Sequence, residues 1–187
     1  LVTNPSIASG KDISIIRLLL RLHKLMVSVH FEMNIVKDAR NWWDCANNSF
    51  YGVDLKEYIP SNILLDLQST SKENAVNKIW DYLDFLYSDL DIQQIIKELQ
   101  DWRDQNGKDI FLIMENTVWK KIPVEVLEVT LTTIRKCPYD PDSRWCMYYP
   151  LDTKGNKKDV SESIRTIVHE LLHMMLHYYY EDYIKEK

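Results

Sequence analysis

The C-terminal segment 160–187 places the strongest constraint on the fold of this chain. Asp159 and Glu162 have the spacing of a helix capping box, which predicts a helix from there to nearly the end. Apolar residues lie on several faces of this helix, at Ile164, Ile167, Val168, Leu171, Leu172 and Met175. A helix that is apolar on several faces must be surrounded, so the segment predicts a helix buried in a core.

Three upstream segments have the apolar spacing of helices. The first runs over 12–39, and Ser71 can cap a second helix that ends near residue 90. Asp91 can start a third helix, which Asn106 and Gly107 would close as a C-cap. Between the first two helices, residues 41–60 are predicted to be less regular.

The period of the apolar residues then changes to that of strands. The short apolar run 110–114 predicts a strand or its edge, and the β-branched stretch 124–134 predicts one or two strands. Residues 145–149 predict another strand after the turn formed by 138–143. The fold class expected is therefore α+β, with N-terminal helices, a small mainly antiparallel sheet and one long C-terminal helix.

Length and charge narrow the class of protein. A chain of 187 residues suits one compact domain, with a helical part over 1–107 and the sheet and last helix over 108–187. The formal net charge of -5, without any run of four basic residues, argues against nucleic-acid partners. Charges such as Arg17 interrupt the longest apolar runs. The sequence is therefore expected to contain no membrane span and no secretory signal.

Three cysteines, an odd number, fit a reducing compartment such as the cytoplasm better than a disulfide framework. Cys137 and Cys146 flank the 138–143 turn, so a hairpin there can bring them together. A disulfide between these two residues, or a metal shared by them, stays an open alternative.

The last helix contains His169-Glu170-Leu171-Leu172-His173. Histidines at i and i+4 lie one above the other on a helix face, so their ring nitrogens can converge on one Zn²⁺ ion. Glu170 is rotated by about 100° from His169 and can reach a water on that metal without being a ligand. Zinc lowers the pKa of such a water to about 7, and the glutamate takes its proton. The plain alternative is a buried helix with two incidental histidines.

This motif resembles that of the zincin metallopeptidases. The resemblance implies that His169 and His173 bind zinc, that Glu170 is the general base and that the substrate is a protein or peptide. It also implies a sheet edge that aligns the substrate, for which 145–149 is the candidate. Leu176 and Tyr179 stand where metzincins have Gly and His, so the chain is gluzincin-like. With His177, the string also resembles ImmA/IrrE-type peptidases.

The third metal ligand that catalytic zinc normally takes is not visible in the sequence. His177 lies about 12 Å of helix rise from His169, which predicts a second-shell, substrate-contact or packing role. Glu181 and Asp182 can serve only if the helix breaks near 178–180. Three explanations stay open: a missing C-terminal piece that carries the gluzincin glutamate, poor metal binding, or an upstream ligand. The upstream candidates are His23, His30 and Glu115.

Tyr148 and Tyr149 are candidates for a hydrogen bond to the developing oxyanion, because several zincins use a tyrosine there. The expected function is hydrolysis of peptide bonds by a zinc-activated water. Two alternatives stay open: a non-catalytic interaction module built on a degenerate zincin fold, and a zinc hydrolase that acts on a non-peptide amide.

Overall fold

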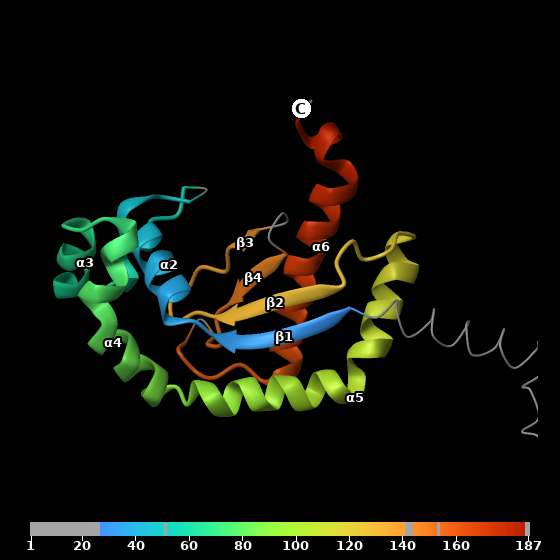
Figure 1. The fold of residues 1–187 in the computed structure, drawn as a ribbon, viewed down its shortest axis with the longest axis horizontal. Helices are drawn as coiled ribbons and strands as arrows, with labels where there is room; N and C mark the ends of the chain where they lie inside the picture. Colours follow the sequence, from blue (N-terminus) through green and yellow to red (C-terminus); the bar gives the residue numbers. More distant parts are fainter. Residues whose placement is uncertain (1–26, 51, 141–143, 153, 186–187) are drawn as a thin grey trace, which may run out of the picture.

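A four-stranded sheet packed against two long helices organises the chain in a computed structural model, which describes residues 27–50, 52–140, 144–152 and 154–185 (Figure 1). The helices and strands in chain order are β1 (Ser28–Met33), α2 (Ile35–Asn47), α3 (Ser61–Gln68), α4 (Ala75–Asp89), α5 (Ile92–Val118), β2 (Val126–Leu131), β3 (Tyr139–Asp140), β4 (Trp145–Tyr148) and α6 (Val160–Lys185). Single 3₁₀ turns at Leu55–Tyr58 and Lys72–Asn74 precede α3 and α4. The α+β class with a long C-terminal helix is confirmed.

The strands are ordered β1-β2-β4-β3, and β1, β2 and β4 run parallel to one another. Only β3 is antiparallel, to β4. The prediction of a mainly antiparallel sheet is therefore wrong. Parallel neighbours need a long crossover, and the helices α2 to α5 provide it between β1 and β2.

The first strand lies inside the segment 12–39 that was predicted to be helical. Val29 and Phe31 are buried, whereas Ser28 and His30, which alternate with them, are exposed, and this is the pattern of a strand. The chain turns helical only after Asn34, whose side chain accepts a hydrogen bond from the backbone N–H of Lys37 at 3.1 Å. The helix prediction is thus wrong for β1; its part before residue 27 lies outside the described residues.

The helix α5 continues through the predicted C-cap at Gly107 and the predicted strand at 110–114, and both predictions are wrong. Ile110 and Met114 are one helical turn apart and face the core, whereas Leu112 and Ile113 face solvent. A short apolar run looks the same in a strand and in a packed helix. The helix ends at Trp119, which has a left-handed backbone with φ 56°.

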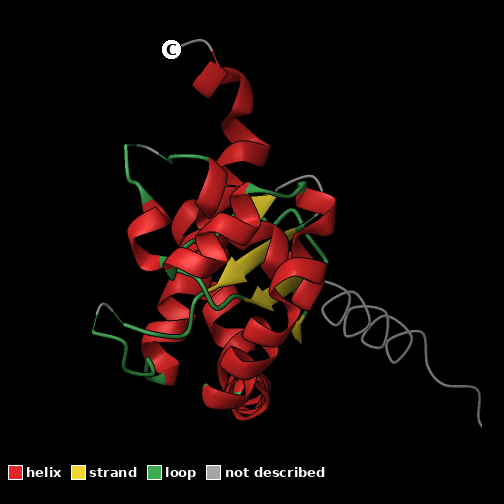
Figure 2. Cartoon of the chain, turned by 90° about the vertical axis from the view of Figure 1, so that its left-hand side faces the viewer, coloured by secondary structure: helices red, strands yellow, loops and turns green. Residues whose placement is uncertain are grey.

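Two clusters of buried side chains stabilise the fold. One joins the sheet to α5 and α6 and includes Val29, Leu127, Tyr148 and Leu171. The other joins α2, α3 and α4, which form the helical end of the molecule at the left of Figure 1. Figure 2 shows the sheet enclosed among helices when this end faces the viewer. The helix predicted over 71–90 is confirmed as α4.

The division at residue 107 stays a prediction about domains. The boundary falls inside α5, and β1 from the N-terminal part pairs along its whole length with β2.

Across the described ranges, no helix combines the length and the apolar character needed to span a bilayer.

A buried carboxylate connects the two clusters. Asp38 on α2 is 0% exposed and accepts hydrogen bonds from the hydroxyls of Thr132 (2.6 Å), Thr133 (2.7 Å) and Tyr87 (3.1 Å). The backbone N–H of Thr133 also donates to it, at 3.1 Å. Burial raises the pKa of Asp38 to about 6, against the opposing effect of these donors. One side chain thus ties α2 and α4 to the segment that leaves β2.

We expect Asp38 to make the stability of the fold fall as the pH rises from 4 to 7. Its pKa is higher in the folded protein, so its contribution is complete below about pH 4 and lost as the pH rises through about 6. The difference corresponds to about 3 kcal/mol. Urea unfolding at several pH values should show wild type losing this much relative to Asp38→Asn, which cannot ionise. Parallel curves for the two proteins would contradict the assignment.

Candidate metal site

The helix α6 starts where the capping residues predict. The Asp159 carboxylate accepts a hydrogen bond from the backbone N–H of Glu162 at 2.8 Å, and the helix begins at Val160. Ile167, Leu171 and Met174 are buried against the sheet and α5. The packing of this face fixes the rotation of the helix and turns the other face, with the histidines, outward.

The two histidines of the motif come together on the outer face of α6. Their Nε2 atoms are 2.9 Å apart, and their rings are nearly perpendicular at 89° with centroids separated by 4.5 Å. In a tetrahedral zinc site, with Zn–N bonds of about 2.0–2.1 Å, two ligand nitrogens are roughly 3.3 Å apart. His169 and His173 therefore fit two corners of such a site after opening by a few tenths of an ångström.

His173 is also suited to bind a metal by its charge state. Burial lowers its pKa, and the neighbouring His169 and His177 lower it further. The neutral imidazole, which is the form that binds metals, is therefore favoured.

Glu170 occupies a different environment from its histidine neighbours. It is only 9% exposed, and burial raises its pKa while His169 opposes the rise. Its charge in turn raises the pKa of the Cys137 and Cys146 thiols, so the carboxylate faces the β3–β4 side of the sheet. A glutamate whose pKa is raised towards neutrality is a better general base than an ordinary one.

The described part of the chain places no third ligand near the pair. Within 27–50, 52–140, 144–152 and 154–181, no three His, Cys, Asp or Glu side chains form a group that could hold a metal. His30 lies on β1, at the sheet edge opposite β3, and faces away from the helices that Val29 and Phe31 contact. Glu115 bonds the Lys121 ammonium at 2.5 Å and the Ile122 N–H at 3.0 Å. Neither residue forms a group of three with the pair in the described ranges, and His23 lies outside the described residues.

The helix α6 is not regular to its end, contrary to expectation. Tyr180 has non-helical backbone angles, φ −135° and ψ 16°, which bend the helix just before Glu181. Glu181 could become a metal ligand only if the helix broke at this point. It is nevertheless exposed and completes no metal-binding group of three in the described part of the chain. The side chain of Asp182 is not described.

The tyrosine candidates lie in other places than predicted. Tyr148 is 1% exposed and its hydroxyl donates to the Ser163 hydroxyl inside the core, so its assignment as a substrate contact is wrong. Tyr149 is half-buried, with its N–H donating to the Cys137 sulfur at 3.3 Å. The aromatic residue that does reach the histidines is Tyr139, whose ring stacks on His173 and touches His177. Sequence reasoning missed it because the contact depends on strand pairing.

The candidate substrate-aligning strand is also corrected. Residues 145–148 form β4, which is paired on both sides, with β2 and with β3. The sheet edge beside α6 is instead β3, which carries Tyr139. Because β4 pairs with β2 as well as with β3, the strand that was predicted to be an edge lies in the interior of the sheet.

All three cysteines are free thiols. Burial raises the pKa of Cys137 to about 11, and the pKa of the more deeply buried Cys146 rises further. Cys137 contributes to the raised pKa of Cys146, which indicates that the two thiols are neighbours. They do not form the disulfide that was considered for the two ends of the 138–143 turn.

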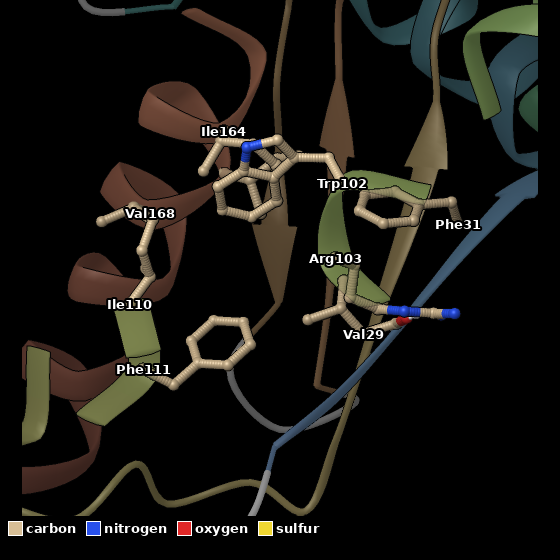
Figure 3. Close-up of a pocket in the computed structure, with 9 residues that line it drawn as sticks. Val29, Phe31, Trp102, Arg103, Ile110, Phe111, Ile164 and Val168 are labelled. Carbon is tan, nitrogen blue, oxygen red and sulfur yellow. Dashed lines mark hydrogen bonds between the residues drawn. The ribbon is translucent and has the colours of Figure 1, made fainter. Parts of the chain in front are cut away.

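A small cavity lies where β1, α5 and α6 meet. It is lined by apolar side chains of β1, α5 and α6, including Val29, Phe111 and Val168, and holds about 10 Å³, the room of one water molecule (Figure 3). The one charged residue at its wall is Arg103, whose guanidinium donates to the Val29 carbonyl at 2.6 Å. None of the motif histidines lines this cavity, so it is a packing gap and not the candidate site.

No protein-family model, no curated protein and no solved structure matches this chain. The site is therefore defined by its own geometry: a helical histidine pair at the surface with a buried glutamate beside it.

Proposed function

We propose that the chain is a zinc-dependent metallopeptidase, in which His169 and His173 bind zinc and Glu170 is the general base. The observation that carries the proposal is the 2.9 Å approach of the two Nε2 atoms on an outward-facing helix surface. Two imidazole nitrogens at this distance need either a shared proton or a shared cation between their lone pairs. The glutamate that follows His169 has the raised pKa that proton transfer needs.

A zinc ion held there would supply Lewis acidity, which polarises a carbonyl and acidifies a water molecule. Glu170 would accept the proton from that water at a carboxylate oxygen and return it to the leaving amine of the peptide bond. His169 and His173 would hold the site, with His173 kept neutral by burial and by its histidine neighbours. The substrate proposed is a protein or peptide, and the three free cysteines support a reducing compartment such as the cytoplasm.

One observation favours a second candidate, a non-catalytic interaction module on a degenerate site. The described residues hold two histidine ligands but no third side chain to complete a catalytic site.

Zinc titration with elemental analysis tests the proposal directly. We expect wild type to bind one Zn²⁺ per chain, and His169→Ala and His173→Ala each to lower the affinity by more than about 10-fold. His30→Ala is the matched control, because His30 is exposed on β1 at the far edge of the sheet. A wild-type protein that binds no zinc, or ligand variants that bind like the control, would contradict the proposal.

A further inference from the structure

The ring of Tyr139 contacts two histidines of α6. Its ring stacks on that of His173 with an interplanar angle of 10° and a centroid distance of 5.4 Å. It also contacts His177 with a centroid distance of 5.5 Å, and these two rings are tilted by 60°. Both distances lie in the range of favourable aromatic pairs. The two histidines are one helical turn apart, so the tyrosine ring touches both.

The backbone of Tyr139 is held in the sheet. Tyr139 pairs with Cys146 in the β3–β4 register, and the preceding Pro138 carbonyl accepts a hydrogen bond from the Met147 N–H at 2.8 Å. The tyrosine side chain is half-buried and packs against the main core. The ring that contacts His173 therefore comes from a residue whose backbone is paired in the sheet.

This contact acts on the orientation of a ligand. The outer torsion of a histidine side chain is soft, so an imidazole on a helix surface samples several orientations. Only one of them points Nε2 at the Nε2 of His169. A nearly parallel ring against His173 removes other orientations before a metal arrives, which is preorganisation of the site.

The same contact accounts for the third histidine of the run. His177 lies about 12 Å along the helix from His169, too far to share one cation with it. It contacts the tyrosine ring instead.

We infer that Tyr139 is a positioning residue, which holds the His173 imidazole turned towards His169, and that His177 supports the tyrosine ring and is not a metal ligand. The inference rests on the proposed function only where it predicts an effect on zinc affinity. The stacking itself belongs to the metal-free protein.

The first test measures Zn²⁺ affinity by competition with a chromogenic chelator. Tyr139→Ala is expected to lower the affinity about 10-fold, as loss of a residue that orients a ligand does, whereas Tyr139→Phe keeps the ring and stays close to wild type. His177→Phe also keeps an aromatic contact and should bind like wild type. Tyr178→Ala is the matched control, because Tyr178 is 66% exposed and its ring contacts Tyr179 edge-on, with the two planes at 82°. Unchanged affinity in Tyr139→Ala, or a loss in His177→Phe as large as in His173→Ala, would overturn the inference.

The second test uses the metal-free protein, so that its failure can be told from failure of the proposed function. In NMR spectra at constant pH, ring current from Tyr139 should shift the His173 ring protons of wild type and Tyr139→Phe upfield of those in Tyr139→Ala. Identical His173 shifts in all three proteins would overturn the inference, even if zinc binds. If wild type binds no zinc but the shift difference is present, the proposed function fails and the orienting contact stands.

Discussion

Glu170→Gln is expected to lower peptide hydrolysis by about 10²–10⁴-fold while Zn²⁺ binding is retained. The amide has the size of the carboxylate but cannot accept a proton from water, so the variant removes the general base alone. Because Glu170 is 9% exposed, an isosteric change also avoids a cavity under α6. Activity on casein and on a mixed peptide pool, measured with the zinc content of the same samples, checks the expectation.

Glu162→Gln provides the matched control for this experiment. Glu162 is an exposed glutamate on the first turn of the same helix, two turns from the histidine pair. It should retain the activity and the zinc content of wild type. If Glu170→Gln hydrolyses peptides as fast as wild type does, the activity does not use this glutamate. A wild type that binds zinc but cleaves no peptide would favour the interaction module or a non-peptide substrate.

Asp38→Ala is expected to lower the free energy of unfolding by about 3–5 kcal/mol. The change removes the acceptor for the hydroxyls of Thr132, Thr133 and Tyr87, all of which are buried. It also leaves the Thr133 N–H without its Asp38 partner. Since Asp38 joins α2 and α4 to the end of β2, the loss should affect the whole fold. Urea unfolding at pH 5 measures it.

Asp44→Ala is the control on the same helix. Asp44 bonds the Lys72 ammonium at 2.7 Å with both partners partly exposed, and such pairs contribute about 1 kcal/mol or less. If Asp38→Ala is no less stable than Asp44→Ala, the buried network does not stabilise the fold as the structure implies.

Local sequence patterns predicted the elements whose signals are local. The capping residues Asp159 and Glu162 predicted the start of α6, and the β-branched stretch 124–134 predicted β2, which forms over Val126–Leu131. The separation of His169 and His173 by four residues predicted their approach, because the geometry of one helix determines it. These predictions hold because each depends on residues within a few positions of one another.

Patterns with two readings were decided by packing. The apolar residues of 28–33 alternate as in a strand, but the helical spacing of the residues around them extended the predicted helix over this segment, which pairs with β2 as β1. The run 110–114 was read as a strand, but burial of Ile110 and Met114 on one side made it part of α5. In both segments the partner lies far away in the sequence, so no local window contains the deciding contact.

The amino-acid sequence by itself determined the helix α6, its start, and the pairing of two histidines beside a glutamate, because helix geometry sets their positions. Only the tertiary structure decided the order and direction of the strands, the burial of Asp38 and the stacking of Tyr139 on His173. It also decided that Tyr148 belongs to the core, that His30 lies at the far edge of the sheet and that Glu115 bonds Lys121 and Ile122. Each of these depends on contacts between segments distant in the chain, which form only when the sheet and helices pack together.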